Sequence, residues 1–337
     1  MKTWGLALAL GVGLASGAQA ADPTVSLKIS MWLPPAHPLV VVAKEWAADI
    51  EKASGGSIKP VVFPSEQLGK AFDHYDMARD GIADMTYVNP GYQPGRFPVI
   101  AVGQIPFTFT DGRKGTAALD GWYRDYAAKE MKDTHFCFAF IHDPGTIHAK
   151  RKIMTPDDIK GLKARPAQGT IGQMVTMLGG TNVQASAPES REMLERGVAD
   201  AIFFPYGSLQ LFGIDKVVKF HMDVPLYTTV FTFSMNPAKY DAMTPAQKAV
   251  MDEHCSTDWA VKVAGPWADF EAAGREKERT APGHEVYSIS ADDLAAWKRT
   301  VAPLEANWAE AVKKAGVDPD GAMKGLKASL AKNGAGF

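Results

Sequence analysis

Residues 155–166 read Thr155-Pro156-Asp157-Asp158-Ile159-Lys160-Gly161-Leu162-Lys163-Ala164-Arg165-Pro166. Thr155, with the proline and the acidic pair that follow it, has the pattern of a helix start. Gly161 then allows a turn into residues 162–165, whose alternation predicts a strand that ends on Arg165. A helical turn followed so closely by a short strand is typical of proteins that alternate helices and strands. The stretch therefore favours an α/β fold.

The same alternation extends along the chain in both directions. Before this stretch, strands are expected at 25–31, 58–63, 83–88 and 136–141, with helices at 37–53, 72–79 and 113–132. After it, we expect a helix at 171–178, a strand at 182–185, a helix opened by residues 186–189 and a strand at 199–203. This order implies parallel strands joined by right-handed crossovers.

The length of 337 residues suggests two domains. We expect lobe I to comprise residues 21–145 plus about 230–265, and lobe II to comprise residues 146–229 plus about 266–320, with 321–337 as a C-terminal tail. The chain would cross between the lobes near 141–148 and in the β-branched, aromatic segment 226–235. Residues 244–278 predict one long helix that braces both lobes, although Gly265-Pro266 could kink it.

The first twenty residues have the parts of an export signal. Lys2 gives the positive start, residues 6–15 are apolar, and Ala18-Gln19-Ala20 is a small-x-small cleavage site. An uncleaved anchor is the alternative, but the cleavage-like tail argues against it, and the apolar part is too short to cross a bilayer. We therefore expect a mature chain that begins at Ala21 and works in the periplasm.

The overall charge of the chain is nearly balanced. The formal net charge is -2, and it becomes -3 when Lys2 is removed with the signal. Because no long basic run accompanies this balance, the sequence gives no footprint for a nucleic-acid partner. A hydrophobic content of 46% is ordinary for a packed globular protein.

Two cysteines leave the disulfide question open. Cys137 lies in the apolar run 135–140, and Cys255 lies in the predicted long helix. An exported protein can form a disulfide, but nothing else in the sequence brings the two residues together. The sequence therefore favours two separate buried thiols.

Arg165 is the foremost candidate for binding a ligand. Its guanidinium stays charged at physiological pH, and its planar fork matches the two oxygens of a carboxylate. Ligands of open α/β sheets bind beyond the carboxyl ends of strands, which is where Arg165 is expected. A surface salt bridge is the alternative role for such an arginine. Other candidates at strand ends, or in the loops after them, are Trp32, Tyr87, Asn89, Tyr92 and His142.

Several short motifs, in this order and spacing, resemble a known family. They are Pro34-Pro35-Ala36-His37-Pro38, Gly55-Gly56-Ser57-Ile58, Phe63-Pro64-Ser65-Glu66-Gln67-Leu68-Gly69, Arg79-Asp80-Gly81-Ile82-Ala83-Asp84-Met85, Ile105-Pro106-Phe107, the stretch 155–165 and Glu195-Arg196-Gly197-Val198-Ala199-Asp200. Together they resemble the extracytoplasmic solute-binding proteins of tripartite ATP-independent periplasmic (TRAP) transporters, the DctP-type family. The resemblance covers nearly the whole mature chain.

This resemblance implies a two-lobed α/β protein that closes around an acidic solute. The arginine matching Arg165 would pair with the ligand carboxylate, and the loaded protein would dock on a membrane permease. We expect no cofactor, no metal site and no catalytic residue, and a monomer. The sequence leaves open whether a cation assists ligand binding.

The chain departs from the family pattern where a polar site is usual. Many members follow the second glycine-aspartate turn with an asparagine that helps hold the carboxylate, and Phe204 takes that place here. A second basic residue of some sugar-acid binders is also missing, with His148 as its nearest substitute. We therefore expect an aromatic or apolar monocarboxylate, with an aliphatic dicarboxylate or a sugar acid as the alternative.

Phe203 and Phe204 alternate, so at most one of them faces the cleft and the other is core. The resemblance to the family implies that Phe204 is the one in the cleft. Tyr206 is a further cleft candidate, and His37 is expected at a helix start near the cleft. For at least one of His142 and His148, a hydrogen-bonded role near the hinge is the simpler interpretation.

A periplasmic α/β enzyme acting on an organic acid is the competing class. The sequence has no Gly-x-Ser-x-Gly elbow, no His-Glu-x-x-His zinc helix and no phosphate-binding loop. Neighbours such as His254 and Cys255 cannot face each other on one helix. We therefore expect a binding protein rather than an enzyme.

Overall fold

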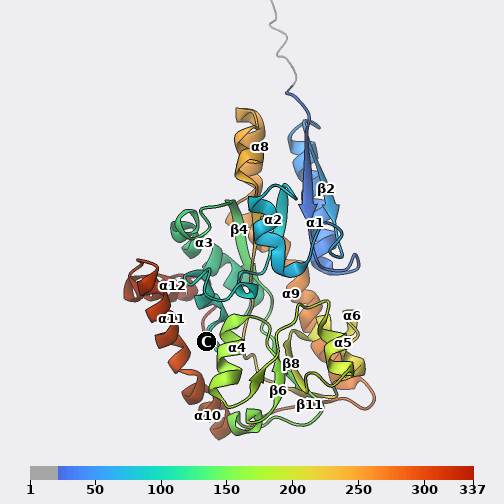
Figure 1. The fold of residues 1–337 in the computed structure, drawn as a ribbon, viewed down its shortest axis with the longest axis vertical. Coiled ribbons are helices and arrows are strands. Elements are labelled where there is room, and N and C mark those ends of the chain that lie inside the picture. The colour runs from blue at the N-terminus through green and yellow to red at the C-terminus, as the bar shows by residue number, and fades with distance from the viewer. Residues whose placement is uncertain (1–21) are drawn as a thin grey trace, which may run out of the picture.

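A computed structural model describes residues 22–337. The predicted signal peptide, residues 1–20, lies outside the described residues. The described chain forms two α/β lobes, each built on its own sheet (Figure 1), as the sequence predicted. No helix within residues 22–337 is both long enough and apolar enough to cross a membrane.

Lobe I, as we use the name from here, is built on a five-stranded sheet in the order β2-β1-β3-β10-β4. Its strands are β1 (Val25–Ser30), β2 (Ile58–Phe63), β3 (Met85–Val88), β4 (His135–Ile141) and β10 (Val230–Met235). Its helices are α1 (Pro38–Ala53), α2 (His74–Arg79) and α3 (Gly112–Glu130). His37 caps α1, because its Nδ1 accepts from the Leu39 amide at 3.1 Å and Pro38 follows at the first helical position.

Lobe II is built on a six-stranded sheet in the order β11-β9-β5-β8-β6-β7. Its strands are β5 (Thr146–Ala149), β6 (Lys163–Arg165), β7 (Thr181–Asn182), β8 (Ala201–Phe204), β9 (Phe220–Met222) and β11 (Glu285–Tyr287). Its short helices are α4 (Gly169–Met177), α5 (Ser190–Glu195) and α6 (Tyr206–Leu211). As predicted, the strand at 163–165 ends on Arg165.

The sheets are mixed, whereas parallel strands were expected throughout. In lobe I, β1 runs parallel to β2 and β3, but β10 is antiparallel to β3 and β4. In lobe II, β5 is antiparallel to β8 and β9. Each exception enters its sheet directly from the other lobe, without the helical crossover that a parallel neighbour requires.

Two segments that cross between the lobes, one around Gly145 and one around Tyr227, lie next to each other. Gly145 and Tyr227 form an isolated antiparallel bridge, with the Gly145 amide 2.8 Å from the Tyr227 carbonyl oxygen. A Cβ at position 145 would lie 2.9 Å from the Phe204 carbonyl oxygen, so this close approach requires glycine. The two crossing segments therefore lie side by side between the sheets.

The segment predicted as one long helix is two helices. The short helix α7 (Pro237–Asp241) precedes them. The first of the two is α8 (Pro245–His254), and the second, α9 (Thr257–Thr280), begins after Cys255 and Ser256. The Ser256 side chain accepts from the Trp259 amide and starts the second helix. Pro266 lies inside α9, which continues to Thr280 and reaches from lobe I to lobe II (Figure 1).

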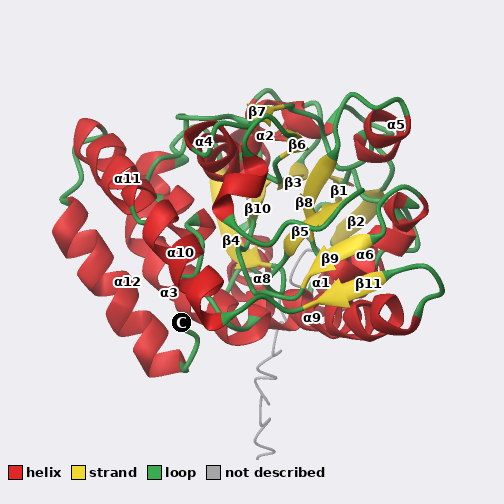
Figure 2. Ribbon diagram, turned by 90° about the horizontal axis from the view of Figure 1, so that it is seen from below, coloured by secondary structure: helices red, strands yellow, loops and turns green. Residues whose placement is uncertain are grey.

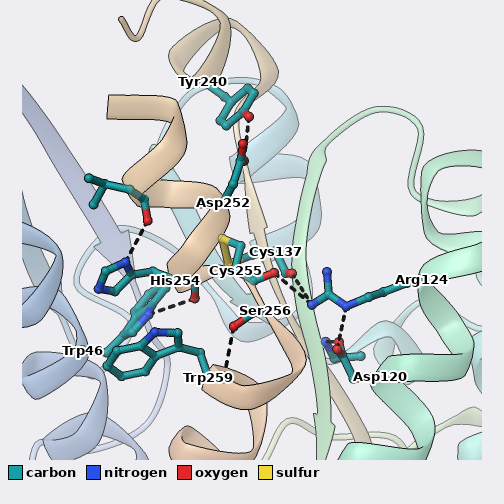
Figure 3. The surroundings of a disulfide bond; sticks show 12 residues. Trp46, Asp120, Arg124, Cys137, Tyr240, Asp252, His254, Cys255, Ser256 and Trp259 are labelled. Atoms are coloured by element: carbon teal, nitrogen blue, oxygen red, sulfur yellow. Dashed lines mark hydrogen bonds and ion pairs between the residues drawn. A yellow bond between two sulfur atoms is a disulfide. The ribbon is translucent and has the colours of Figure 1, made fainter. Parts of the chain in front are cut away.

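Cys137 and Cys255 form a disulfide, so the expectation of two separate thiols is wrong (Figure 3). The bond joins β4 to the interruption between α8 and α9. Arg124 on α3 donates to the carbonyl oxygens of both cysteines, at 3.1 and 2.9 Å, and pairs with buried Asp120. Lobe I is thereby tied to the start of the long helix.

Three C-terminal helices run along one side of the molecule (Figure 2): α10 (Ala291–Val301), α11 (Pro303–Lys314) and α12 (Pro319–Asn333). Trp297 on α10 is buried in lobe II, and α12 packs against α3 of lobe I. Trp122 donates to the Ala322 carbonyl oxygen at 3.0 Å, and Ser329 donates to that of Ala118 at 2.8 Å. This segment is therefore a further connection between the lobes.

Candidate functional site

A partly open cavity lies between the two lobes, with about 360 Å³ of empty space when the solvent at its mouth is included. Its walls come from the loop after β1, the segment after β3, both crossings, the ends of β6 and β8, and α9. The lining residues are Trp32, Leu33, His37, Asn89, Tyr92, His142, Arg165, Ala167, Ala187, Phe204, Pro205, Ser208, Phe212, Tyr227, Thr229, Phe231 and Trp267.

Arg165 is the only lysine or arginine in this lining. It is 1% exposed, and its hydrogen bonds go to neutral oxygens. Nε donates to the Ala185 carbonyl oxygen at 3.0 Å, Nη1 to that of Phe203 at 3.4 Å, and Nη2 to the Tyr92 hydroxyl at 3.2 Å. These bonds use three of the five N–H groups of the guanidinium. One N–H on Nη1 and one on Nη2 are therefore left for another acceptor.

No carboxylate within the described part of the chain lies within 4.0 Å of the Arg165 guanidinium. Glu189 is near enough for Arg165 to contribute to the lowering of its pKa, but hydrogen bonds from Ser186 are the larger cause. Those bonds, from the Ser186 hydroxyl at 2.7 Å and amide at 3.0 Å, hold the carboxylate. A buried charge without a counter-ion is costly, so the site favours an anion.

Aromatic side chains from both lobes form most of the remaining wall. Trp32 lies 5.9 Å from Tyr92 and 6.3 Å from Phe231, measured between ring centroids, and Phe231 lies 5.2 Å from Trp267. On the side of lobe II, the Phe204 ring lies 5.6 Å from the Arg165 guanidinium carbon. Rings at such distances bury apolar ligand surface and make favourable edge and offset contacts.

Glu271 on α9 holds the Trp267 wall in place. Its Oε1 accepts from Trp267 Nε1 at 2.6 Å and from the Ser208 hydroxyl, and its Oε2 accepts from the Gly207 and Ser208 amides. Burial raises the pKa of Glu271 to about 7, although these donors favour its ionised form. The carboxyl group thus joins the long helix to the start of α6 beside the cavity.

Both histidines in the lining are neutral near pH 7. Burial lowers the pKa of His37 to about 3 and that of His142 to about 4. His142 is fully bonded, because Nδ1 donates to the Asp143 carbonyl oxygen and Nε2 accepts from the Thr229 amide at 3.1 Å. Since His37 Nδ1 accepts from Leu39, its Nε2 carries the proton, and it has no acceptor within residues 22–337. His142 is thus structural, whereas His37 keeps a free donor.

Two further buried polar groups in the lining, Trp32 Nε1 and the Tyr227 hydroxyl, have no hydrogen-bond partner among the described residues. Buried polar atoms are rarely left unpaired in native proteins. With Arg165 and His37 Nε2, the cavity therefore offers an excess of donors over acceptors. Such a set fits a ligand whose polar atoms accept hydrogen bonds, as those of a carboxylate do.

The structure brings most of the predicted site residues to one cavity: Trp32, His37, Asn89, Tyr92, His142, Arg165 and Phe204. Phe203, the neighbour that alternates with Phe204, faces the core of lobe II instead. Asn89 is largely committed, because its Oδ1 accepts from the Gly91 amide and its Nδ2 lies 3.5 Å from the Ala167 carbonyl oxygen.

Tyr87, His148 and Tyr206 lie outside the cavity wall. Tyr87 lies behind Trp32, with ring centroids 4.8 Å apart, because its position in β3 points it into the core of lobe I. His148 donates to the Phe204 carbonyl oxygen and contacts His221, and Tyr206 donates to the Met222 carbonyl oxygen. These three residues can support the wall, but they do not form it.

Sequence reasoning missed Tyr227, Phe231, Phe212 and Trp267 in the lining. The first two lie in the aromatic crossing segment 226–235, where alternation could have placed Thr229 and Phe231 on one face. No sequence signal marks Trp267, because the residues of α9 that face the cavity depend on how the helix lies across both lobes.

A sequence profile of the family described as bacterial extracellular solute-binding protein, family 7 (DctP), matches residues 29–311. Three similar solved structures are TRAP solute-binding proteins. One from Rhodoferax ferrireducens, solved with copurified benzoate, is 29% identical with a TM-score of 0.86, covering 92% of this chain and 99% of that one.

A marine metagenome protein described as specific for aromatic acid ligands was solved with 3-hydroxybenzoate. It is 30% identical with a TM-score of 0.86, covering 93% and 99% of the two chains. A protein from Bordetella bronchiseptica, solved with (R)- and (S)-mandelate, is 27% identical with a TM-score of 0.86, covering 91% and 99%. The family match and these full-length similarities agree with the fold described above. This chain therefore belongs to the DctP family of bacterial extracellular solute-binding proteins, the solute-binding components of TRAP transporters.

Proposed function

We propose that this protein captures an aromatic monocarboxylate between its lobes and delivers it to a TRAP membrane permease. The observation that carries the proposal is the Arg165 guanidinium, which is buried in an aromatic cavity with no carboxylate partner in the described part of the chain. The ligand carboxylate would take the two free N–H groups, one on each terminal nitrogen. The charge of the site would thereby be balanced.

The lining favours an aromatic ring as the body of the ligand. Trp32, Phe204, Phe231 and Trp267 offer ring faces and edges from both lobes. A sugar acid needs several hydroxyl partners and a dicarboxylate needs a second cation, whereas Arg165 is the only cationic side chain of the lining. The benzoate, hydroxybenzoate and mandelate bound by the similar proteins support the same ligand class.

We also propose that the protein binds its ligand without changing it chemically, and that it acts as a monomer in the periplasm. Tyr92 stands on lobe I, and its hydroxyl accepts from Arg165 and from the Ala187 amide of lobe II at 2.9 Å. A ligand held beside this contact would favour the closed arrangement of the lobes, which a permease could distinguish from the open one.

Titration calorimetry on the chain from Ala21 tests the ligand class. The ligands would be benzoate, 3-hydroxybenzoate, mandelate, succinate and glucuronate, with benzamide as the uncharged match of benzoate. We expect one-to-one saturable binding of an aromatic acid, no binding of benzamide, and recovery of the ligand unchanged. Binding of only succinate or glucuronate would contradict the aromatic class and leave the transport role standing. Conversion of the ligand would contradict the transport role itself.

A further inference from the structure

A second polar cluster lies in lobe II, away from the cavity. It joins His221 on β9, Glu278 near the end of α9, and His284 in the loop before β11. His221 Nε2 lies 2.9 Å from His284 Nδ1 and 3.8 Å from Glu278 Oε2, and His284 Nδ1 lies 2.9 Å from Glu278 Oε2. Three potential ligand atoms, from three separate elements, therefore converge on one point.

The hydrogen bonds around His221 leave its Nε2 without a proton, so that this lone pair accepts from His284 Nδ1 when no ion is bound. His148 Nε2 must donate to the Phe204 carbonyl oxygen, at 2.9 Å, so His148 Nδ1 is an acceptor. His221 Nδ1, 2.9 Å from it, is then the donor, and His221 Nε2 carries no proton. In metal sites a histidine is commonly oriented in this way, by a partner on its other ring nitrogen.

Glu278 supplies an independent indication of a ligand. Its side chain is 0% exposed, and Gln210 donates to its Oε1 at 3.0 Å. Its Oε2 has no hydrogen-bond partner in the described chain, because the contact with His284 Nδ1 lacks hydrogen-bond geometry. A buried carboxylate oxygen beside two imidazoles, with nothing donating to it, lacks the partner that burial requires.

We propose that His221 Nε2, Glu278 Oε2 and His284 Nδ1 bind a divalent late-transition-metal ion, for which Zn²⁺ is the natural probe. Two histidines and one glutamate form a ligand set that zinc accepts, with the fourth position left to water. The partly exposed His284 loop gives the ion a way in.

The spacing of the three atoms suits such an ion. A tetrahedral zinc with bonds of about 2.0–2.1 Å holds its ligand atoms about 3.3 Å apart. The printed separations of 2.9, 2.9 and 3.8 Å lie around that value. Shifts of roughly half an ångström, mostly of the loop histidine, would complete the site.

Lys219 is the group that must move. Its Nζ lies 2.9 Å from His284 Nε2, which would carry a proton once Nδ1 binds a metal. The ammonium also donates to the Asp215 carbonyl oxygen at 2.8 Å, and the buried carboxylate oxygen Oδ1 of Asp215 has no hydrogen-bond partner among residues 22–337. Turning toward Asp215 would free His284 and keep Lys219 paired.

An ion here would fasten the end of the long helix to the lobe II sheet. It would also hold His221, and through it His148, whose Nε2 donates to the carbonyl of Phe204 in the cavity wall. The proposed role is therefore structural, at a site separate from the solute cavity.

The test uses untagged mature protein, because an oligohistidine tag would itself bind zinc. After treatment with EDTA, Zn²⁺ is titrated by calorimetry and Co²⁺ by visible absorption, which reports the coordination geometry. We expect one ion per chain, a rise in melting temperature, and a low-symmetry Co²⁺ spectrum. Glu278→Gln and His284→Gln should each weaken binding at least tenfold.

The matched control is His254→Gln. His254 Nε2 also faces a carboxylate, Asp49 Oδ2 at 3.2 Å, but no third ligand joins this pair in the described residues. This variant should bind zinc as the wild type does. No stoichiometric binding by the wild type, or equal binding by the Glu278 and His284 variants, would overturn the proposal.

Discussion

Replacing Arg165 with methionine should remove most of the affinity for an aromatic acid. Methionine fills much of the same space but carries neither the charge nor the N–H fork. The guanidinium has two N–H groups free for the carboxylate, in a side chain that is 1% exposed. Loss of such a buried charged pair costs roughly 2–5 kcal/mol, or about 30-fold to several-thousand-fold in Kd.

The assay is calorimetric titration of benzoate and of benzamide into wild type and variant. Because benzamide lacks the charge, the wild type should prefer benzoate strongly, and Arg165→Met should lose most of that preference. Arg165→Lys should fall between them, since it keeps the charge but not the fork. Arg165→Met also leaves the carbonyl oxygens of Ala185 and Phe203 without the guanidinium as a hydrogen-bond donor. Thermal melting must therefore show that the Arg165→Met variant is folded.

Arg151→Met is the matched control for this experiment. Arg151 is in the same lobe, but its side chain is 53% exposed and its ion pair with Asp158 is long, at 3.7 Å. Its loss should leave benzoate affinity unchanged. Arg165→Met binding within threefold of wild type, or keeping the full preference for benzoate over benzamide, would refute the reasoning.

Three further predictions concern the frame around the cavity. Replacing both Cys137 and Cys255 with serine should lower the free energy of unfolding by roughly 4–5 kcal/mol, because the disulfide closes a loop of sequence separation 118. Urea titration measures this change, and a loss of under about 1 kcal/mol would contradict the prediction. Tyr92→Phe should weaken benzoate binding by about 1–2 kcal/mol, since the hydroxyl joins Arg165 to the Ala187 amide across the lobes; unchanged affinity in calorimetry would count against the closed contact. Burial lowers the pKa of His37 to about 3, so the folded protein holds this histidine neutral. The resulting stability is fully present above the unfolded pKa near 6.5 and is lost as pH falls toward 3. Between pH 7 and 5 the free energy of unfolding of the wild type should therefore fall by about 2 kcal/mol more than that of His37→Asn, which can still cap α1; an equal fall for both proteins in urea titrations would contradict this.

The sequence predicted those parts of the fold that depend on local pattern. Alternation and helix-start residues placed Arg165 at the end of β6, and period-two alternation separated Phe204 from Phe203. The two-lobed fold and the family are confirmed. The strand ends needed only residues that are close in the chain, whereas the family and its two lobes were inferred from the order of short motifs between Pro34 and Asp200.

The parts that could not be predicted depend on long-range geometry. The partners of the disulfide are 118 positions apart, and the break in the predicted long helix becomes meaningful only beside Cys137. Trp267 reaches the cavity because α9 crosses both lobes. Likewise, β5 and β10 are antiparallel because of where the chain enters each sheet, which no local pattern records.

A crystal structure of the mature protein with bound benzoate tests the central claim most directly. The account predicts both carboxylate oxygens within about 2.7–3.1 Å of Nη1 and Nη2 of Arg165, with the ring between Trp32 and Phe204. A carboxylate bound elsewhere, with the Arg165 guanidinium turned to solvent, would contradict it.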